Sequence, residues 1–441
     1  MDIDKYHSAS GDKAYFEGHY YSQAAPGTSF MAVPVVFLTK LYLESNQKEI
    51  KWVHESKRRV TLNFIIALQF ATIVISGLLT ALTGLFLYLV ALRLGFGLSG
   101  AVFGSLTFGL ATPAWGWSTT FFGHSSASGF LFLGFTAIYY LLNSKAEKRR
   151  DILLAFSAGA LLSWAVVVEY TSAPASVIIA LYGVIAAWGW ERERLIRILI
   201  CAFSGALLFI LPLLLYHYKA FGDPFVTGYK YHVTLTRVNE GFYGIKLPKL
   251  QVAGSLLFGL KRGIFWFSPI LLLVPIALYG QWKTPGKKGL AIMIAFIAAS
   301  YLVWSSAYVY WTAGASTGPR LITPMLPFLC LSLAFLWGKA GRVLKAIMLL
   351  FSAISFVISL MSVSVSMFIQ NPSKIHLVSK YIVPKFLEAG HLKTSLIVRL
   401  IAPSFDGTSH MHLLPFYIIL TVGFIYILWE LHKYNAREVD S

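Results

Sequence analysis

From Leu62 to the C-terminus the chain alternates long apolar runs with short, basic, polar loops. A helix of about 20 apolar residues crosses the roughly 30 Å hydrocarbon core of a bilayer. Lipid offers no partner to exposed backbone groups, so spanning runs of this length are helical. The pattern therefore predicts an all-α fold, a polytopic transmembrane helix bundle of about eleven spans. These lie near residues 62–92, 98–117, 120–142, 152–170, 172–190, 197–216, 263–281, 289–309, 321–338, 344–369 and 413–431.

The composition excludes a soluble globular protein. Of the 441 residues, 57% are hydrophobic and 13% are charged, whereas soluble domains carry about 25% charged residues. The 37 Lys and Arg residues outnumber the 19 Asp and Glu residues, but they fall in short loops, as in membrane proteins rather than nucleic-acid binders. Cys201 and Cys330 both lie inside apolar runs, which excludes a disulfide framework and a paired-cysteine zinc site. We expect no cofactor. The sequence shows no metal requirement, because no His, Cys and carboxylate cluster has ligand spacing, and it leaves metal dependence open.

Four cationic loops orient the bundle. Residues 143–150, 191–197, 282–288 and 338–345 fall on one side when the spans are counted in order. Because Lys and Arg are enriched in cytoplasmic loops, we expect a multi-pass plasma-membrane protein with its active face extracytoplasmic. The expected regions are an extracytoplasmic loop with an interfacial helix at 1–61, the bundle with outer loops 217–262 and 372–412 at 62–431, and a cytoplasmic tail at 432–441.

Two segments before Leu62 are unusual. The run from Pro26 to Leu43 is apolar but short and split by Pro34, which favours a helix lying along the membrane interface. Residues 48–59 are basic, yet the span count places them outside. There are three interpretations. They form a cationic collar that meets a lipid phosphate through Lys57, Arg58 and Arg59, they are an exception to a statistical rule, or the run 62–92 consists of two half-spans.

Candidate general bases lie on the outer face. Transfer to a hydroxyl or amine requires a carboxylate within hydrogen-bond reach of the acceptor. Asp4 and Asp12 flank a Ser/Gly turn in the N-terminal loop, where the alternative is an ordinary solvated acid. Glu169 ends an apolar run, where an ionised carboxylate is costly unless paired or hydrated, so the alternative is a structural salt bridge. His124 opens the run after 120 and either relays a proton or is simply hydrogen-bonded.

An anion site is expected near Arg320. The segment TAGASTGPRLITPMLPF, Thr312 to Phe328, places glycines, small hydroxyls and one arginine at the mouth of a helix. Free backbone N–H groups and a guanidinium there suit phosphate, although Gly-Pro is also a common way into a helix. The segments Lys219–His232, with Tyr229, and Gly259–Pro269 mix aromatic and basic residues. Such residues suit either sugar rings or the bilayer interface.

Six segments follow one another along the chain: GHYYSQAAPGTSFMAVP, ATPAWGWSTTFFGHSSAS, EYTSAP, FGDPFVTGY, KRGIFWFSPILLL and WTAGASTGPRLITPMLPFL. Taken together, and in this order, they resemble segments of the GT-C superfamily of membrane glycosyltransferases, which includes the protein O-mannosyltransferases and the aminoarabinose transferase. The resemblance covers most of the chain. It implies a sugar donor carried on a polyprenyl phosphate and transfer on the extracytoplasmic side to a lipid, glycan or protein.

Two departures from the family pattern bear on activity. Gln23 and Ala24 stand where relatives commonly have an acidic residue and a lysine. Relatives also begin with a membrane helix and a catalytic acidic residue, which here would lie upstream of Met1. We therefore expect an in-frame upstream sequence encoding an apolar segment and an acidic loop, or else a truncated and inactive copy.

The function expected is an integral membrane glycosyltransferase that transfers a sugar from a polyprenyl-phosphate carrier by inverting displacement. The alternatives are a catalytically inactive lipid-binding partner and a lipid-linked sugar transporter or flippase, which needs polar residues at mid-depth and often internal repeats. The lipid-linked sugar donor is expected as substrate, without a cofactor. Expected partners are membrane lipids, the carrier and its acceptor, with no nucleic acid. The catalytic candidates are Asp4, Asp12, Glu169 and His124, and the substrate-binding candidates are His19, Tyr20, Tyr21, Lys57, Arg58, Arg59, Tyr229 and Arg320.

Overall fold

The computed structural model describes residues 2–9, 11–45, 52–55, 58–239, 241–369, 376–388 and 413–439. Within those ranges, eight helices are long and apolar enough to cross a membrane. This confirms the helical membrane bundle expected from the sequence. The eight are Phe64–Arg93, Gly123–Leu142, Lys148–Val168, Tyr170–Ala187, Arg192–Phe221, Lys288–Ala307, Arg320–Lys339 and Arg342–Val365.

The other three expected spans are shorter or broken. Helix α4 (Leu98–Leu110) ends before Pro113 and is followed by the short helix α5 (Ala114–Ser118), and the apolar part of α18 (Leu414–Val439) is also short. The run 263–281 divides into α11 (Ile264–Phe267), η6 (Pro269–Leu273) and α12 (Val274–Lys283). Pro269 disfavours helical geometry at Ser268, which has φ −144° and ψ 76°. The Ser268 hydroxyl donates to the carbonyl of Ala111 at 2.6 Å, so the two breaks stabilise each other.

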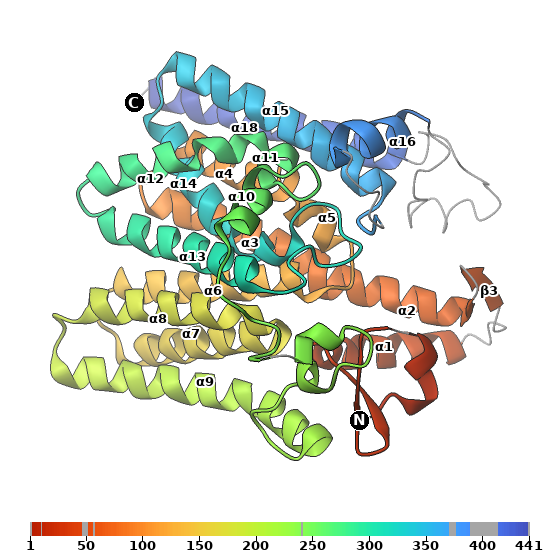
Figure 1. Ribbon diagram of the computed structural model, residues 1–441. Helices are drawn as coiled ribbons and strands as arrows, with labels where there is room; N and C mark the ends of the chain where they lie inside the picture. Colours follow the sequence, from red (N-terminus) through yellow and green to blue (C-terminus); the bar gives the residue numbers. More distant parts are fainter. Residues whose placement is uncertain are drawn as a thin grey trace.

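The bundle is built around two buried helices, α6 (Gly123–Leu142) and α14 (Leu326–Lys339), both largely enclosed by neighbours. On one side of α6 lie α7 (Lys148–Val168), α8 (Ala173–Ala187) and α9 (Arg192–Phe221); on the other lie α3 (Leu78–Arg93), α4, α12, α13 (Lys288–Ala307), α14 and α15 (Arg342–Val365), as Figure 1 shows. Small residues allow close approach in lipid. A Cβ at Gly104 would lie 2.6 Å from the Cβ of Ala334, so α4 packs directly on α14.

The N-terminal segment forms elements that the apolar pattern did not predict. Strands β1 (Lys13–Phe16) and β2 (His19–Ser22) pair antiparallel. Glu17 and Gly18, with φ 47° and 88°, form the two-residue turn, which requires positive φ at both positions. A second hairpin pairs β3 (Trp52–Glu55) with β4 (Arg58–Thr61).

Helix α1 (Gly27–Ser45) lies between the hairpins and contains Pro34. Only glycine fits at its first residue, because a Cβ at Gly27 would lie 2.6 Å from the backbone of Val167 at the end of α7. Phe37, Leu38 and Tyr42 of α1 are exposed; its place at the membrane interface stays a prediction. One continuous helix long and apolar enough to span a membrane extends from Phe64 to Arg93. It includes most of α2 (Leu62–Thr72), then η2 (Ile73–Gly77) and α3, so the run 62–92 does not consist of two half-spans.

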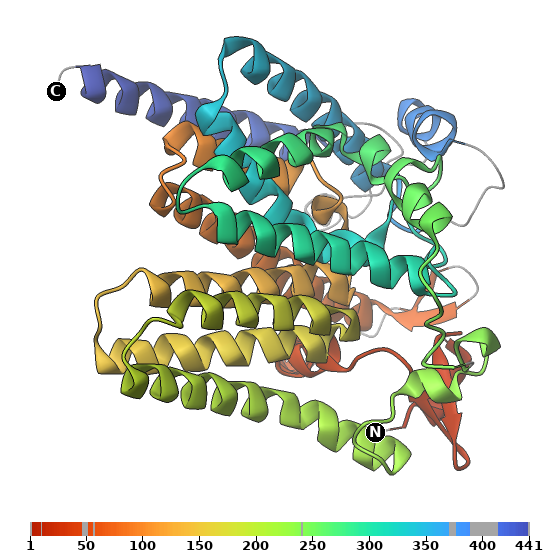
Figure 2. The same ribbon diagram turned by 60° about the vertical axis from the view of Figure 1, so that its left-hand side comes forward.

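Both views place the connections after α6, α8 and α12 at one end of the bundle and the N-terminal hairpin at the other (Figures 1 and 2). The basic loops that follow these three helices are therefore together, as the span count requires; which end faces the cytoplasm stays a prediction. The remaining elements are η1 (Asp4–Ala9), η3 (Tyr170–Ser172), η4 (Gly228–Tyr231), η5 (Thr236–Asn239), α10 (Leu250–Phe258), η7 (Arg320–Met325), η8 (Val378–Ile382) and α16 (Val383–Leu387).

Candidate functional site

The start of α6 and the end of α7 bring His124 and Glu169 together. Glu169 follows the last residue of α7 in extended geometry, and its Oε2 lies 3.1 Å from Nδ1 of His124. The two helix ends are close because Gly123 has no side chain: a Cβ there would lie 2.7 Å from the carbonyl oxygen of Val168. A carboxylate beside the amino end of α6 is also favoured by the helix dipole.

Glu169 is ionised at neutral pH. Burial raises the pKa of its carboxyl, but the nearby His124 ring and the Arg320 guanidinium act in the opposite direction, and the net pKa is lowered. The Thr171 hydroxyl adds a hydrogen bond to Oε1 at 3.4 Å. An ionised carboxylate in this position can accept a hydrogen bond from an acceptor hydroxyl or stabilise positive charge on a sugar ring.

The Arg320 side chain lies at the mouth of a helix among aromatic rings. It is the first residue of η7 and lies over two rings, 4.8 Å from the centroid of Phe122 and 5.8 Å from that of Trp117. Its Nε is buried without a hydrogen-bond partner, and in the ranges given above the side chain makes no ion pair. Leaving a buried charged donor unpaired is costly, so this position favours binding of an anion.

Two more predicted residues interact with Arg320. Its charge interacts most strongly with Glu169, then with Asp12, and then with Tyr229 and Tyr308. Burial raises the pKa of Tyr229 well above its ordinary value, so its hydroxyl stays a neutral donor. The structure therefore brings five of the sequence candidates into one electrostatic cluster, which we call the Arg320 cluster: His124, Glu169, Arg320, Asp12 and Tyr229.

Arg262 fixes the loop that leads to Arg320, a role that the sequence reading missed. Its side chain is 3% exposed; Nη1 donates to the carbonyl of Ser316 and Nη2 to that of Gly314 at 2.7 Å. Burial and the charge of Arg320 lower the pKa of Arg262 to about 10, so it stays protonated at neutral pH. In the sequence, only its place in the mixed basic and aromatic segment Gly259–Pro269 pointed to Arg262.

Tyr170, beside Glu169, is tied to α9. Nδ1 of His217 lies 3.1 Å from the carbonyl of Pro224, which can only accept, so Nδ1 carries the proton. Nε2 therefore accepts from the Tyr170 hydroxyl at 2.8 Å. These two hydrogen bonds hold the turn that contains Glu169 against α9. The sequence analysis did not identify Tyr170 or His217 as candidates.

The N-terminal candidates build the first hairpin instead. Oδ2 of Asp4 lies 2.7 Å from Nδ1 of His19, and Oδ1 accepts the Tyr20 backbone N–H at 2.6 Å. The Tyr20 ring stacks on His7 at 4.3 Å, and Tyr21 packs on Phe221. Asp4, His19 and Tyr20 make contacts within the N-terminal segment and Tyr21 packs on α9, so the role of these four residues at the Arg320 cluster stays a prediction.

The hairpin positions the loop that carries Tyr229. Ala14 of β1 bridges to His232, and the Thr234 hydroxyl donates to the carbonyl of Gly11 at 2.8 Å. Gly228 lies against the backbone of Gln23, where a Cβ would approach to 2.8 Å. The N-terminal segment therefore holds η4 over the bundle end.

The structure describes only part of the cationic collar expected at residues 48–59. Lys57 lies outside the described residues. Arg58 and Arg59 lie in β4, opposite Glu55 and His54 of β3. Their binding to a lipid phosphate stays a prediction.

No family model matches the chain, and no curated protein matches it in sequence. Among solved structures, the fold is similar to that of ArnT from Cupriavidus metallidurans in the apo state, with a TM-score of 0.51 and 15% identity over 88% of this chain. The chain spans 64% of the length of that protein. A structure of the same ArnT bound to undecaprenyl phosphate aligns with a TM-score of 0.47 and 15% identity, over 83% of this chain and 71% of that one. The chain therefore has an ArnT-like fold.

Proposed function

We propose that this chain is an integral membrane glycosyltransferase that transfers a sugar from a polyprenyl-phosphate carrier to an acceptor at the extracytoplasmic face. One observation carries the proposal. The Arg320 guanidinium, which makes no ion pair among the described residues, interacts electrostatically with the ionised Glu169, whose Oε2 lies 3.1 Å from His124, at one end of an apolar bundle. An anion-binding group next to a carboxylate suits displacement of a phosphate from a sugar carbon.

The reaction forms one bond and breaks one bond. The acceptor oxygen bonds to the anomeric carbon, and the bond from that carbon to the phosphate oxygen breaks, with its electron pair leaving on the phosphate. The acceptor proton passes to a carboxylate, for which Glu169, Asp12 and Asp4 are the candidates. Attack from the side opposite the phosphate inverts the anomeric centre.

Arg320 has two roles in this proposal. Its guanidinium neutralises the charge that accumulates on the leaving phosphate. The rings of Phe122 and Trp117 beneath it exclude water and keep the arginine in place, which strengthens its attraction for an anion.

His124 and Tyr229 orient the reacting groups. His124, 3.1 Å from Glu169, keeps that carboxylate in one position. Tyr229, whose hydroxyl stays protonated, supplies a neutral donor for a sugar hydroxyl or the phosphate.

The test is transfer by the purified protein in lipid nanodiscs, given labelled polyprenyl-phosphate sugars and a membrane extract as the source of acceptor. We expect a labelled product from the wild-type chain and at least about a 100-fold loss with Arg320→Ala. Arg342→Ala is the matched control, because Arg342 is exposed at the start of α15. Unchanged turnover by Arg320→Ala would remove Arg320 from the mechanism.

The same preparation separates the alternatives. A change in the sidedness of the labelled lipid without product would indicate a flippase. Binding without either product or movement would indicate an inactive lipid-binding partner.

A further inference from the structure

A cavity of about 1020 Å³ lies between α3, α4 and α18, and we call it the α18 groove. Residues from Gly77 to Leu92 line it on the α3 side, and residues from Leu98 to Leu110 line it on α4. From Gly77 to Leu92 the helical run rises roughly 22 Å. The groove is therefore longer than one leaflet of a hydrocarbon core that is roughly 30 Å thick.

Most of the α18 groove is apolar. The hydroxyls of Thr80, Ser105 and Ser118 line it, but each donates to a backbone carbonyl three or four residues earlier in the chain, at 2.7, 3.0 and 2.7 Å. The rest of this part is formed by small and aliphatic residues, namely Ala81, Gly84, Leu85, Val102, Leu106 and Gly109. Along this length the groove fits a hydrocarbon chain, since a polar ligand would lose its hydrogen bonds to water there.

One end of the α18 groove carries charged groups. Glu430 and Lys433 of α18 line it together with Tyr88 of α3. Among the described residues, neither Glu430 nor Lys433 makes an ion pair. The Lys433 ammonium lies 3.3 Å from the centroid of the Trp429 ring, which restricts its position. Residues three apart lie on one face of a helix, so a carboxylate and an ammonium face the groove side by side.

The direction of α18 shows which end this is. Phe416, near the start of the helix, packs on Trp115 of α5 with ring centroids 5.3 Å apart. Lys433 comes seventeen residues later, roughly 25 Å along the helix, near the end of α3 and the start of α4. Both views place the C-terminal end of α18 at the bundle end that carries the connections after α6, α8 and α12 (Figures 1 and 2). A lipid of that leaflet therefore has its head at the charged pair and its tails along the apolar part.

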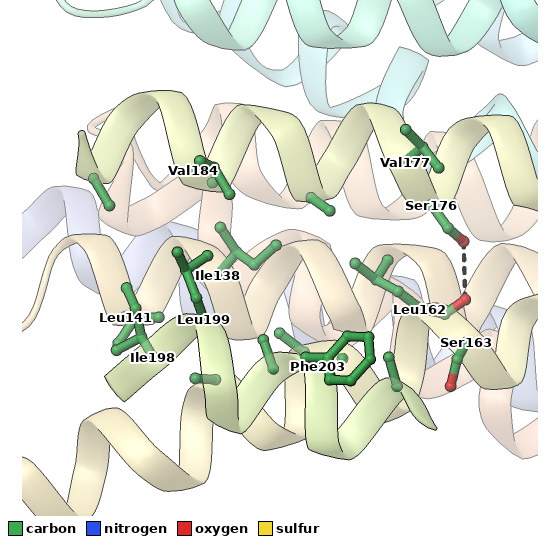
Figure 3. Close-up of a pocket in the computed structure, with 18 of the residues that line it drawn as sticks. Ile138, Leu141, Leu162, Ser163, Ser176, Val177, Val184, Ile198, Leu199 and Phe203 are labelled. Carbon is green, nitrogen blue, oxygen red and sulfur yellow. Dashed lines mark hydrogen bonds between the residues drawn. The ribbon is translucent and has the colours of Figure 1, made fainter. Parts of the chain in front are cut away.

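The groove between α6, α7, α8 and α9 has no such charged end. It encloses about 420 Å³ and is shown in Figure 3. None of its described lining residues is charged, and the Ser176 hydroxyl donates to the carbonyl of Leu162 at 2.9 Å. Of these two grooves, the α18 groove is the one whose charges select a particular head group.

We propose that the α18 groove binds a membrane phospholipid with a primary-amine head group, with its phosphate at Lys433, its ammonium at Glu430 and a tail along α3 and α4. A lysine donates charge-assisted hydrogen bonds to a phosphate, and a primary ammonium donates them to a carboxylate. A quaternary ammonium has no N–H to donate, and a head group with only a negative charge leaves Glu430 without a cation. The proposal does not depend on the proposed glycosyltransferase activity.

The experiment compares three phospholipids that have the same acyl chains: phosphatidylethanolamine, phosphatidylcholine and phosphatidylglycerol. Each is titrated into the purified protein in detergent, and native mass spectrometry gives its dissociation constant. The variants Glu430→Gln and Lys433→Met remove the two charges one at a time. Glu193→Gln and Lys339→Met are the matched controls, because Glu193 in the first turn of α9 and Lys339 at the end of α14 are exposed and do not line the groove.

We expect the wild type to bind phosphatidylethanolamine about tenfold more tightly than the other two lipids, which is the effect of one charge-assisted hydrogen bond. Glu430→Gln should abolish this preference. Lys433→Met should weaken all three lipids by about tenfold, because all three have the phosphate. The two control variants should behave as the wild type.

A third variant tests where the tail lies. Ala81→Phe places a ring in the groove and should weaken all three lipids by about tenfold or more. Ala186→Phe is its control, because Ala186 is exposed on α8 and does not line the groove. Circular dichroism shows whether each variant keeps its helical content, and the head-group comparison decides the proposal even if Ala81→Phe unfolds.

Two results would overturn the proposal. Equal binding of the three lipids to the wild type, or a preference that survives in Glu430→Gln, would mean that the groove holds only unselected lipid from the surrounding bilayer. Binding that is unchanged in a folded Ala81→Phe variant and in Lys433→Met would place the lipid elsewhere on the protein.

Discussion

Nδ1 of His124 lies 3.1 Å from Oε2 of Glu169 and so joins the first turn of α6 to the residue that ends α7. Neither helix could supply this pair alone. The contact depends on Gly123, which lies against the carbonyl of Val168. It holds Glu169, one of the two carboxylates of the Arg320 cluster, in one position.

Replacing Glu169 should remove most of the proposed activity. Glu169→Gln keeps the shape of the side chain but removes the charge, and we expect transfer to fall by about 100-fold or more. Product formation at saturating donor measures the effect. Glu191→Gln is the control, because Glu191 is exposed before α9 at the other end of the bundle. Turnover of Glu169→Gln within twofold of wild type would exclude this carboxylate as base or charge stabiliser.

Removing Arg262 should loosen the loop before Arg320. Arg262→Met leaves the carbonyls of Gly314 and Ser316 without their donors, and we expect a loss of about 3 kcal/mol in the free energy of unfolding. Thermal unfolding in detergent measures it. Lys261→Met, at the neighbouring and less buried position, should change the stability little. Equal melting temperatures for the two variants would contradict the anchoring role.

Breaking the hydrogen bond between Tyr170 and His217 should destabilise the turn at Glu169. In Tyr170→Phe the buried Nε2 of His217 loses its donor, at a cost of about 1–2 kcal/mol. Hydrogen exchange of the amides at 169–173 should increase locally. Tyr218→Phe is the control, since Tyr218 is 55% exposed on the same helix. Unchanged exchange in Tyr170→Phe would show that the turn is held by other contacts.

The α7–α9 contact should not tolerate a methyl group. Gly159→Ala places a Cβ against the carbonyl of Ala202, and we expect a loss of about 3 kcal/mol in stability. Gly189→Ala is the matched control, because a Cβ there meets nothing within 4 Å. Thermal unfolding distinguishes the two. A Gly159→Ala variant as stable as the wild type would mean that α7 and α9 can separate without cost.

The Asp4–His19 pair should make the first hairpin sensitive to pH. Hydrogen bonds from the Tyr20 amide and from His19 lower the pKa of Asp4 below 3.8, and the bond to Asp4 raises the pKa of His19 above 6.5. The contribution of His19 is therefore complete below pH 6.5 and is lost as pH rises through its raised pKa. The contribution of Asp4 is present above pH 3.8 and is lost as pH falls through its lowered pKa.

An NMR titration of His19 tests this pair. Asp4→Asn should return the pKa of His19 towards 6.5, and Asp2→Asn, the control, should leave most of the shift in place because Asp2 is its smallest cause. A His19 pKa that is the same in wild type and Asp4→Asn would contradict the pairing.

The sequence by itself determined the architecture. Apolar runs about 20 residues long can only be helices in lipid, so most of the spans were predicted close to their observed bounds. Gly-Pro before Arg320 and the acidic residue after an apolar run also marked two members of the Arg320 cluster, because glycines and an arginine at a helix entry suit an anion and an ionised carboxylate at the end of an apolar run is costly unless it is paired or hydrated. The positions at which the apolar helices break were harder to predict. Ser268 has non-helical geometry, which both Pro269 and the hydrogen bond to the carbonyl of Ala111 favour.

Only the tertiary structure decided which polar residues meet. Periodicity describes one helix at a time, whereas the distance from His124 to Glu169 depends on how closely α6 and α7 approach. The same is true of Arg262. Its sequence context is that of an ordinary interfacial basic residue, and its role depends on two carbonyl groups that lie more than fifty residues away in the chain. The sequence did not predict the first hairpin, because its strands are four residues long and its contacts include His232 and Thr234, which are distant in the chain.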